Sequence, residues 1–445
     1  MLFKNYNRLI MNGSTPAIQK MRKDILDMCI AAVDAVNPYN VVKKVISRQK
    51  IKCDKKRIDL SQFHHLYVIG FGKASVGMAQ AVVDLVPGVR GVVITNDPAA
   101  KIKGGHVEVI LGGHPLPTKG SIVGTEKILS LIGQCDSRDC ILVLISGGGS
   151  SLLCKPRIPL SDLQKTTDLL LKSGANIEEL NTIRKHLSFV KGGLLATHTK
   201  AMMISLIISD IVLDPISSIA SGPTSPDAST FADAKKILQN YGLWSKVPET
   251  VKQVIKKGIA GETPETLKKD NPVFEHVHNC IIANNKTACT AVVKKAKKLG
   301  YHTVLLSTSV IGEARTIGPY LIEKARQSLS PKKTVFIAGG EPVVTVQGSG
   351  SGGRNQELVL SCVEEIAGTK ITMAAFATDG IDGNSDAAGA LADGVTLQRA
   401  KKKNMDPTTF LKENNSYTFF TTLHDTLLTG PTGTNVMDIH LYIKP

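Results

Sequence analysis

Short apolar runs rich in Val, Ile and Leu recur along this 445-residue chain, and a glycine- or aspartate-rich turn follows directly after most of them. Each run has the length of a β-strand, and stretches with helical periodicity, such as 74–86 and 287–299, lie between them. Strands that alternate with helices predict an α/β fold with a doubly wound, largely parallel sheet. The expected strands are 66–70, 91–95, 107–111, 140–145, 203–208, 280–283, 303–306, 334–338, 373–377 and 417–421.

The length of the chain predicts more than one domain, because single hydrophobic cores rarely extend beyond about 250–300 residues. Between Pro248 and Pro272 the sequence is rich in Lys, Glu, Gly, Thr and Pro and has weak periodicity, which is typical of a domain boundary. We therefore expect a basic N-terminal extension over 1–16, an N-terminal α/β domain over 17–262 and a smaller C-terminal α/β domain over 263–445.

The formal net charge of +16 is compatible with an anionic partner. The lysines lie in short runs, at 294–298 and 401–403, on what we interpret as helix faces, and no aromatic side chain lies among them to stack on bases. We interpret these runs as solvated surface and expect no nucleic-acid partner. No apolar run reaches the length of a transmembrane helix, so we expect no membrane partner either.

The eight cysteines form no Cys-x-x-Cys pair, and several lie inside apolar runs. This pattern predicts buried free thiols in a reducing compartment, and neither disulfides nor a zinc site. Five basic residues and no acidic residue precede Asp24. A mitochondrial transit peptide has such a composition. Because Pro16 interrupts the segment, we expect a cytoplasmic protein and keep the mitochondrial location as the alternative.

The turn Gly70-Phe71-Gly72-Lys73-Ala74-Ser75 follows the first expected strand and precedes a helix. It approaches the dinucleotide fingerprint Gly-x-Gly-x-x-Gly, but Ser75 stands where the third glycine belongs. Lys73 at the start of the helix would fix an anion directly, and Gly72 would let a ligand approach the backbone. In open α/β sheets ligands bind beyond the carboxyl ends of strands, so this turn is a candidate site.

Ser146-Gly147-Gly148-Gly149-Ser150-Ser151, the first glycine loop, follows a strand that we expect to be buried. Its successive glycines leave several amides free to converge on one anion, with hydroxyl groups beside them. No Gly-Lys-Ser/Thr follows, so it is not a Walker loop. The Gly-x-Ser-x-Gly elbow is absent, which argues against a serine hydrolase.

The second glycine loop, 348–353, ends in Gly352 and Gly353 and delivers Arg354 to the start of a helix. A guanidinium offers two donors to a transferring phosphoryl group, so Arg354 is a candidate catalytic residue and the two glycines are candidate nucleotide ligands. His114 and His186 are further candidates for acid–base roles.

Carboxylates follow several of the expected strands. Asp210 and Asp214 lie four residues apart, and Glu341 and Asp379 follow two later strands. Magnesium takes one or two carboxylates together with phosphate oxygens, so we assign Asp214, Glu341 and Asp379 as candidate metal ligands. Asp210 is the preferred candidate for the group that orients or deprotonates a substrate hydroxyl. Together the loops predict an α/β enzyme for anionic ligands that transfers a phosphoryl group.

From about residue 20 to 443 the chain closely resembles the glycerate 2-kinase family, whose members carry a MOFRL domain at the C-terminal end. The resemblance rests on ten segments in one order: Gly-Phe-Gly-Lys-Ala-Ser at 70–75, Gly-Gly-His-Pro-Leu-Pro at 112–117, Ile-Ser-Gly-Gly-Gly-Ser-Ser at 145–151, Asn-Thr-Ile-Arg-Lys-His-Leu-Ser at 181–188, Lys-Gly-Gly at 191–193, Ala-Ser-Gly-Pro-Thr at 220–224, Gly-Glu at 340–341, Gly-Gly-Arg-Asn-Gln-Glu at 352–357, Thr-Asp-Gly-Ile-Asp-Gly at 378–383 and Thr-Gly-Pro-Thr-Gly-Thr-Asn at 429–435.

The resemblance implies a Rossmann-like N-terminal domain, a MOFRL portion at about 333–440 and an active site in the cleft between the two domains. It implies transfer of the γ-phosphoryl group of ATP, with Mg²⁺, to the 2-hydroxyl of D-glycerate. The essential lysine and arginine of the family would be Lys73 and Arg354, and its aspartate would be Asp210 or Asp214. Asn181 and Arg184 are then candidates for holding the glycerate carboxylate. We expect a monomer or a homodimer.

Two positions depart from the family pattern. Leu213 replaces the usual glycine of Ser-Asp-Val-x-Gly-Asp, which we expect to stiffen the turn before Asp214, and Thr118 replaces the acid after His-Pro-x-Pro. Three alternatives stay open: phosphorylation at the 3-hydroxyl, an NAD(P)-dependent hydroxypyruvate reductase that uses the turn at 70–75 and Asp97, and a binding protein without turnover.

Overall fold

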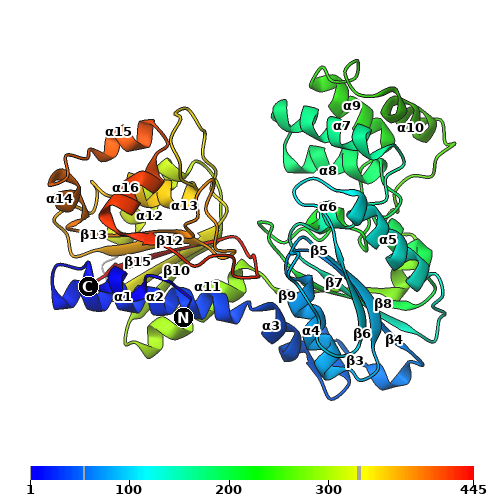
Figure 1. Cartoon of the computed structure of the whole chain (residues 1–445), viewed down its shortest axis with the longest axis horizontal. Coiled ribbons are helices and arrows are strands. Elements are labelled where there is room, and N and C mark those ends of the chain that lie inside the picture. The colour runs from blue at the N-terminus through cyan, green and yellow to red at the C-terminus, as the bar shows by residue number, and fades with distance from the viewer. Residues whose placement is uncertain (1, 54–55, 328–331) are drawn as a thin grey trace. The chain divides into compact units, whose positions relative to one another are not determined.

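The structure is a computed structural model that describes residues 2–53, 56–327 and 332–445. Its contacts divide the chain into two compact units (Figure 1). Unit 1 comprises Met1–Asn37, Asp210–Leu213 and Ala283–Pro445, and unit 2 comprises Pro38–Ser209 and Asp214–Ile282. The described residues of each unit contain a six-stranded sheet with helices packed on it, which confirms the predicted α/β class.

Unit 2 is built on a sheet with the strand order β6-β5-β4-β7-β8-β9, in which the neighbours from β6 to β8 all run parallel. Counted by appearance within this sheet, the order is 3-2-1-4-5-6, the strand order of the Rossmann fold. The order reverses between β4 and β7, and ligands bind at such a switch point. The strands are β4 (Leu66–Phe71), β5 (Arg90–Thr95), β6 (His106–Leu111), β7 (Cys140–Ile145), β8 (Met202–Ile208) and β9 (Val277–Ala283).

The central strand β7 shows why these segments pair in parallel. All of its residues are apolar and buried, as expected for a parallel strand that is covered on both faces. A small antiparallel sheet lies in the same unit and consists of β1 (Ile46–Ser47), β2 (Lys50–Cys53) and β3 (Lys56–Asp59). The helices of unit 2 are α3 (Pro38–Val45), α4 (Ser75–Leu85), α5 (Lys119–Ile132), α6 (Gly149–Leu152), α7 (Leu160–Lys172), α8 (Ile177–His186), α9 (Phe231–Asn240) and α10 (Glu249–Ile259).

Helices α7, α8, α9 and α10 gather in a layer of their own within unit 2 and share a hydrophobic core (Figure 1). Helix α8 begins at a capping box, in which Asn176 accepts a hydrogen bond from the amide of Glu179 and Glu179 accepts one from the amide of Asn176. This box fixes the first turn of the helix that carries Asn181 and Arg184.

Unit 1 contains a mixed sheet in the order β10-β11-β15-β12-β13-β14. Among the described strands of this sheet β10 and β11 are the one parallel pair, so the expected parallel arrangement does not extend to this unit. The reason is that β15, which comes from the end of the chain, inserts between β11 and β12 and pairs antiparallel with both. The strands are β10 (His302–Val310), β11 (Thr334–Gly340), β12 (Thr372–Ala377), β13 (Gly389–Asp393), β14 (Thr426–Leu427) and β15 (Asp438–Lys444).

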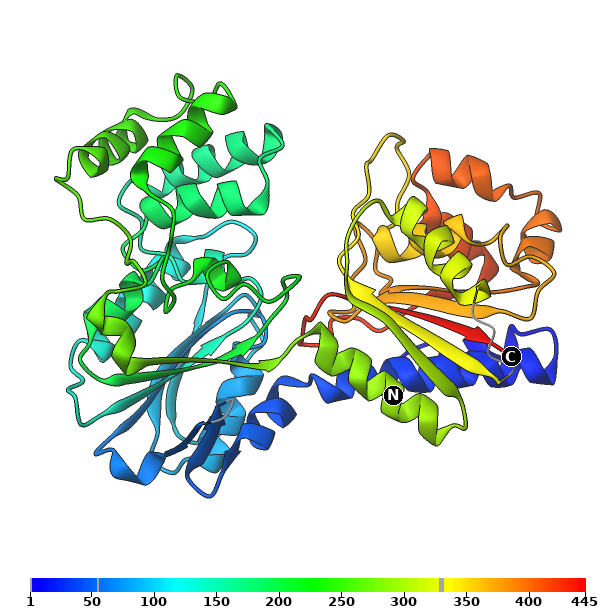
Figure 2. The ribbon, with the colours of Figure 1, turned by 180° about the vertical axis from the view of Figure 1, so that it is seen from behind.

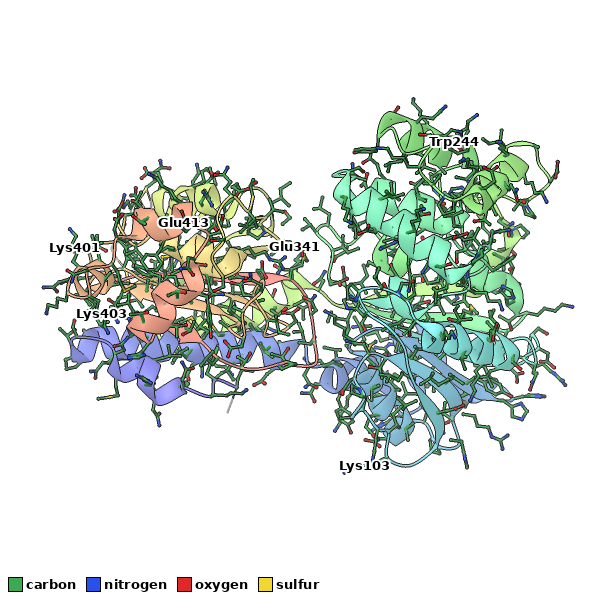
Figure 3. The ribbon with its side chains drawn as sticks, turned by 45° about the horizontal axis from the view of Figure 1, so that its top comes forward. Lys103, Trp244, Glu341, Lys401, Lys403 and Glu413 are labelled. Atoms are coloured by element: carbon green, nitrogen blue, oxygen red, sulfur yellow. A yellow bond between two sulfur atoms is a disulfide. The ribbon has the colours of Figure 1, made fainter. Side chains whose placement is uncertain are left out.

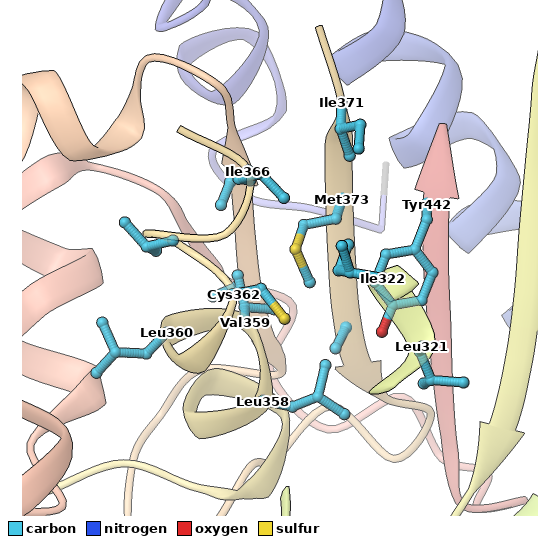
Figure 4. Close-up of a cluster of buried hydrophobic side chains, with 14 of the residues drawn as sticks. Leu321, Ile322, Leu358, Val359, Leu360, Cys362, Ile366, Ile371, Met373 and Tyr442 are labelled. Carbon is cyan, nitrogen blue, oxygen red and sulfur yellow. The ribbon is translucent and has the colours of Figure 1, made fainter. Parts of the chain in front are cut away.

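The predicted strand at 417–421 is wrong, because these residues lie in helix α16 (Ser416–Leu423). Tyr, Thr and Phe favour strands by local propensity, but the helix buries Phe419 and Phe420 completely in the core of unit 1. Figure 4 shows part of this core, where Leu358 of α13 and Cys362, which directly follows α13, face Met373 of β12 and Tyr442 of β15. The remaining helices of this region are α11 (Asn285–Lys298), α12 (Ala314–Arg326), α13 (Arg354–Ser361), α14 (Thr396–Lys401) and α15 (Pro407–Lys412).

The first residues of the chain pack into unit 1 rather than forming a separate extension. Helix α1 (Tyr6–Met11) buries Leu9, and α2 (Pro16–Ala35) lies beside α11, as Figures 1 and 2 show. Arg22 of α2 is fully buried and donates to Asp393 at 2.6 Å and to Asp425 at 2.8 Å. The two units therefore divide the chain differently from the predicted domains, with one boundary at Asn37/Pro38 and another at Ile282/Ala283.

Part of the expected boundary region, 248–272, forms helix α10 within unit 2. Among the described residues no single helix has the length and apolarity to cross a membrane, although α2 and α3 pass that test together as a bent pair.

The expectation that all cysteines are free is wrong for one pair. Cys53 of β2 and Cys280 of β9 form a disulfide with a Cα–Cα distance of 5.5 Å, and the other six cysteines are buried free thiols. The two partners are 227 residues apart, so no local spacing pattern announces the bond. Only the folding of β2 and β9 into the same unit brings them together.

The buried ion pairs of Arg22 predict a stability effect. Arg22→Met leaves the carboxylates of Asp393 and Asp425 buried with fewer partners, and removing one member of such a network costs about 3–5 kcal/mol of unfolding free energy. The neighbouring variant Lys23→Met removes only an exposed ion pair to Asp27 and should change the unfolding free energy by less than about 1 kcal/mol. Denaturant unfolding monitored by circular dichroism measures both, and equal effects would contradict the assignment.

The disulfide predicts a thiol count. Denatured under non-reducing conditions, the protein should react with six equivalents of a thiol reagent, and after reduction with eight. Peptide mass mapping should find the linked pair at Cys53 and Cys280. Eight reactive thiols before reduction would show that the bond is absent.

Candidate active site

The turn after β4 and the first glycine loop after β7 meet at the switch point of the unit 2 sheet. The amide of Lys73 donates to the carbonyl of Gly147 at 2.8 Å, and the amide of Ala74 donates to the hydroxyl of Ser146 at 3.1 Å. Gly72 permits this approach, because its φ is +135° and a Cβ there would collide with Ser146 Oγ. Two loops that are far apart in the sequence thus form one surface.

Three amides of the first glycine loop have no acceptor among the described residues, namely those of Gly147, Gly148 and Ser150. Gly148 has a φ of +81°, and the chain then enters the single turn of α6, in which Gly149 is the first residue. Successive amides in such a left-handed turn form a concavity that binds anions. The geometry therefore supports the predicted anion-binding role of this loop.

Lys73 and Arg184 add positive charge beside the loop, and neither has a carboxylate partner in the parts of the chain that the structure describes. Burial lowers the pKa of Arg184 to about 10. His114 lies against Gly148, and burial together with the charges of Lys73 and Arg184 lowers the pKa of its imidazole to about 4. His114 is therefore neutral near pH 7 and cannot act there as a general acid that gives up the proton of an imidazolium.

Neutral polar groups complete this part of the site. The hydroxyls of Ser150 and Ser221 lie 2.9 Å apart, and Ser221 donates to Asn181 Oδ1 at 2.9 Å. Asn181 and Arg184 are three residues apart on α8 and therefore share one face of the helix. The backbone of Ser221 is left-handed, with a φ of +62°, and Ala220 before it has a φ of +51°. Strained backbone of this kind is concentrated at functional sites.

Ser221 and Lys191, which belongs to the same cluster, were not predicted from the sequence as site residues. Lys191 Nζ donates to the carbonyl of Ser150 at 2.6 Å and to that of Leu153 at 3.0 Å. Both missed residues lie in segments that carried the family resemblance, 191–193 and 220–224. Their presence in those segments is the feature of the sequence that could have identified them as site residues.

Arg354 stands at the first turn of α13 in unit 1, and two carboxylates hold it. Its guanidinium donates to both oxygens of Asp438, at 2.5 and 3.2 Å, and to Glu341 at 3.0 Å. Although burial opposes it, the charge of Asp438 and then that of Glu341 raise the pKa of Arg354. Asp438 was not predicted from the sequence, because it enters through β15, a strand that the sequence analysis missed.

The second glycine loop differs from the first in that most of its amides have acceptors within the protein. The amides of Gly348 and Gly352 donate to the side chains of Asn414 and Asn384, and that of Gly350 donates to the carbonyl of Glu413. A Cβ at Gly353 would collide with Asp382, whose carboxylate caps the start of α13. Gly352, Gly353 and Arg354 nevertheless line a pocket of about 440 Å³, so a nucleotide-binding role stays a prediction.

The predicted metal ligands do not form a cluster of their own. Among the described residues no group of three or more His, Cys, Asp or Glu side chains could hold a metal ion. Glu341, labelled in Figure 3, follows β11, and burial raises the pKa of its carboxyl, with further contributions from the charges of Asp438 and Asp210. Asp379 accepts a hydrogen bond from the amide of Ile381 in its own turn.

Two family models match the chain. One is described as "Domain of unknown function (DUF4147)" and matches residues 24–256, and the other is described as "MOFRL family" and matches residues 334–438. The chain is 43% identical over 426 residues to the glycerate 2-kinase of Pyrococcus horikoshii, a match that covers 93% of this chain and 94% of that protein. The chain belongs to the glycerate 2-kinase family.

A second member of the glycerate 2-kinase family, the D-glycerate 2-kinase of Thermotoga maritima, is 36% identical over 432 residues, which cover 95% of this chain and 98% of that protein. A solved structure of glycerate kinase from the same organism matches this structure with a TM-score of 0.83 and 35% identity, over 96% of this chain and 100% of that chain. The MOFRL match at 334–438 lies within the portion expected at about 333–440.

The two departures from the pattern of the glycerate 2-kinase family have local structural reasons. Leu213 and Asp214 have φ values of +65° and +56°, so the leucine takes the left-handed conformation for which the family uses glycine. Its side chain is 82% exposed, which removes any steric conflict apart from the backbone strain. Thr118 is the N-cap of α5, where its hydroxyl takes part in a capping box with Ser121.

His186 has a structural role. Its Nε2 lies 3.0 Å from Glu265, its Nδ1 lies 2.8 Å from the carbonyl of Thr182, and its ring packs edge-on against Phe231. Both ring nitrogens are used within unit 2, so we assign it no part in the chemistry.

The first glycine loop predicts a binding defect that can be separated from backbone strain. Gly148→Ala forces alanine into a left-handed conformation and places its Cβ 2.9 Å from His114, whereas Gly174→Ala imposes a similar φ of +78° in open space. Each variant should lose about 1 kcal/mol of unfolding free energy from the strain. Only Gly148→Ala should weaken ATP binding, by roughly tenfold or more, as calorimetric titration measures. Equal ATP affinities in the two variants would contradict the role of the loop.

Proposed function

We propose that this chain is a D-glycerate 2-kinase, which transfers the γ-phosphoryl group of ATP to the 2-hydroxyl of D-glycerate and releases 2-phospho-D-glycerate and ADP. One observation carries the proposal beyond the family assignment. Lys73 and Arg184 lie at a glycine loop with free amides, and no carboxylate neutralises them among the described residues. A folded protein keeps such a charge excess where an anion binds, and both substrates are anions.

The groups of unit 2 divide into two roles. Lys73 and the amides of the first glycine loop would bind phosphate oxygens, because both are donors at the switch point of the sheet. Asn181 and Arg184 would hold the glycerate carboxylate, since a guanidinium and an amide on one helix face offer several parallel donors. Gly72 keeps the two loops close enough for one ligand to contact both.

Asp210 would orient the glycerate hydroxyl or accept its proton, and Asp214 is the alternative. Arg354 would stabilise the charge that develops on the transferring phosphoryl group. Asp438 and Glu341 fix the orientation of its guanidinium before any substrate binds, which lowers the reorganisation required in the transition state.

Magnesium would neutralise phosphate charge during the transfer. Hard cations of this size take one or two carboxylates and complete their coordination with water and phosphate oxygens, so the carboxylates of Asp214, Glu341 and Asp379 have suitable chemistry without a preformed cluster among the described residues. Glu341 also accepts a hydrogen bond from Arg354 at 3.0 Å.

The hydroxypyruvate reductase alternative has weaker support in the geometry. The third glycine of a dinucleotide fingerprint allows close helix–strand packing, but Ser75 is buried here and donates to the carbonyl of Gly72 at 2.7 Å. The carboxylate of Asp97, the candidate ribose ligand, accepts a hydrogen bond from the amide of Ala99 in its own turn. Lys401, Lys402 and Lys403 are exposed, and Lys401 and Lys403 lie at the surface in Figure 3. In the other lysine run Lys295 is partly buried and forms an ion pair with Asp27 at 3.7 Å. The absence of a nucleic-acid partner, the cytoplasmic location and the monomer or homodimer stay predictions.

The reaction can be tested by ³¹P NMR of the product formed from D-glycerate and ATP with Mg²⁺. A resonance of 2-phospho-D-glycerate together with ADP is expected, and a resonance of the 3-phosphate would instead identify the other hydroxyl. A parallel incubation with D-glycerate and NAD⁺ should produce no NADH. Hydride transfer without phosphorylation would overturn the proposal.

Two variants test the residue assignments. Arg354→Ala should lower kcat by roughly 10³–10⁵-fold, as expected for an arginine that stabilises a transferring phosphoryl group. Lys73→Met should lower kcat/KM for ATP, and because Lys73 has no ion pair among the described residues its loss should leave the thermal midpoint almost unchanged. Arg326→Ala removes an exposed ion pair to Glu365 and serves as the control with normal turnover. Near-normal turnover of Arg354→Ala would contradict its assignment.

A further inference from the structure

Lys191 is a buried lysine whose ammonium group bonds to carbonyl oxygens instead of a carboxylate. Its side chain is 4% exposed, and Nζ donates to the carbonyls of Ser150 and Leu153 at 2.6 and 3.0 Å. No acidic side chain pairs with it among the described residues. The buried Lys185 differs, because Asp227 neutralises it at 3.0 Å. A buried cation without a carboxylate is costly, so its presence calls for a function.

The two carbonyls that Lys191 binds frame the single helical turn of α6. Ser150 lies inside this turn, and Leu153 follows its end, where the amide of Leu153 donates back to Gly149. A turn of four residues has too few internal hydrogen bonds to fix its own orientation. The ammonium group of Lys191 supplies two more, and these connect the turn to the segment 190–193. The free amides of the first glycine loop, those of Gly147, Gly148 and Ser150, lie in this turn or directly before it.

We infer that Lys191 is a positioning residue for anion binding, whose charged ammonium group holds the first glycine loop in the orientation that presents its amides to a phosphate or carboxylate group. It does not need to touch the substrate to do so. The inference rests on the proposed function for the identity of the substrates, but the clamping of the loop can be tested with ATP binding alone.

The protonation state of Lys191 makes this role dependent on pH. Burial first, and then the charge of Arg184 on α8, lower the pKa of Lys191 to about 8, while the buried thiol of Cys154 acts in the opposite direction. The thiol itself stays protonated near neutral pH, because burial raises the pKa of Cys154. Above about pH 8 the ammonium group loses its charge, so the loop loses its strongest donor and the site loses a cation.

The same titration affects the stability of the fold in the opposite direction. The pKa of Lys191 lies below its ordinary value of 10.5, so between about pH 8 and 10.5 the unfolded chain binds a proton that the folded chain does not. The unfolding free energy contributed by this residue therefore rises with pH through that window, whereas the affinity for anions falls. A decline of ATP affinity in this window without a loss of stability is a signature that general unfolding cannot produce.

The test compares the wild type with Lys191→Met and Lys191→Arg, and uses Lys185→Met as the matched buried lysine. ATP affinity is measured by calorimetric titration from pH 6.5 to 9.5, together with the thermal midpoint at each pH. For the wild type we expect the Kd for ATP to rise roughly tenfold or more across pH 8, in keeping with the loss of one charge-assisted contact. Lys191→Met should have a high Kd at every pH and no step, and its KM should change more than its kcat.

Lys191→Arg keeps its charge throughout this range, so its ATP affinity should show no step near pH 8, and a step like that of the wild type would contradict the role of Lys191. Lys185→Met should lower the thermal midpoint but keep the step in ATP affinity near pH 8. If Lys191→Met folds and keeps both the wild-type affinity and the pH step, the inference is wrong. If the wild type binds ATP with the pH step but phosphorylates no glycerate, the proposed function fails and the inference stands.

Discussion

The short hydrogen bond from the amide of Lys73 to the carbonyl of Gly147 is the contact on which the candidate site depends. It joins the turn after β4 to the first glycine loop after β7 where the strand order of the unit 2 sheet reverses. The sheet brings the carboxyl ends of these strands together, and Gly72 removes the side chain that would otherwise keep the loops apart. This contact places Lys73 and the free amides of the first glycine loop together at the switch point of the sheet.

The two units differ in whether the cations of the candidate site have carboxylate partners. In unit 2 Lys73, Arg184 and Lys191 have no carboxylate partner among the described residues, so no acidic side chain offsets their charge there. In unit 1 Arg354 is held by Asp438 and Glu341, which fix its direction and offset its charge. The first arrangement suits the binding of an anion, and the second suits a preorganised donor that acts on charge as it develops.

Much of the fold could be predicted from periodicity, and the failures have physical reasons. Buried parallel strands such as β7 are continuous apolar runs, so they stand out in a sequence. Helix α16 was assigned as a strand, because the preference of its aromatic residues for strands is weaker than the gain from burying Phe419 and Phe420. The disulfide and the ion pairs of Arg22 join residues hundreds of positions apart, and local pattern contains no information on such contacts.

The sequence by itself determined the chemical inventory of this protein: two glycine loops, Lys73, Arg354 and the aspartates, placed after strands where ligands bind. Only the tertiary structure decided how each of them is used. It left three amides of the first glycine loop without an acceptor among the described residues and bonded most of those of the second, and it added Lys191 and Asp438 to groups that the sequence had described without them. Residue type fixes which bonds a group can make, but only folding decides which partners it meets.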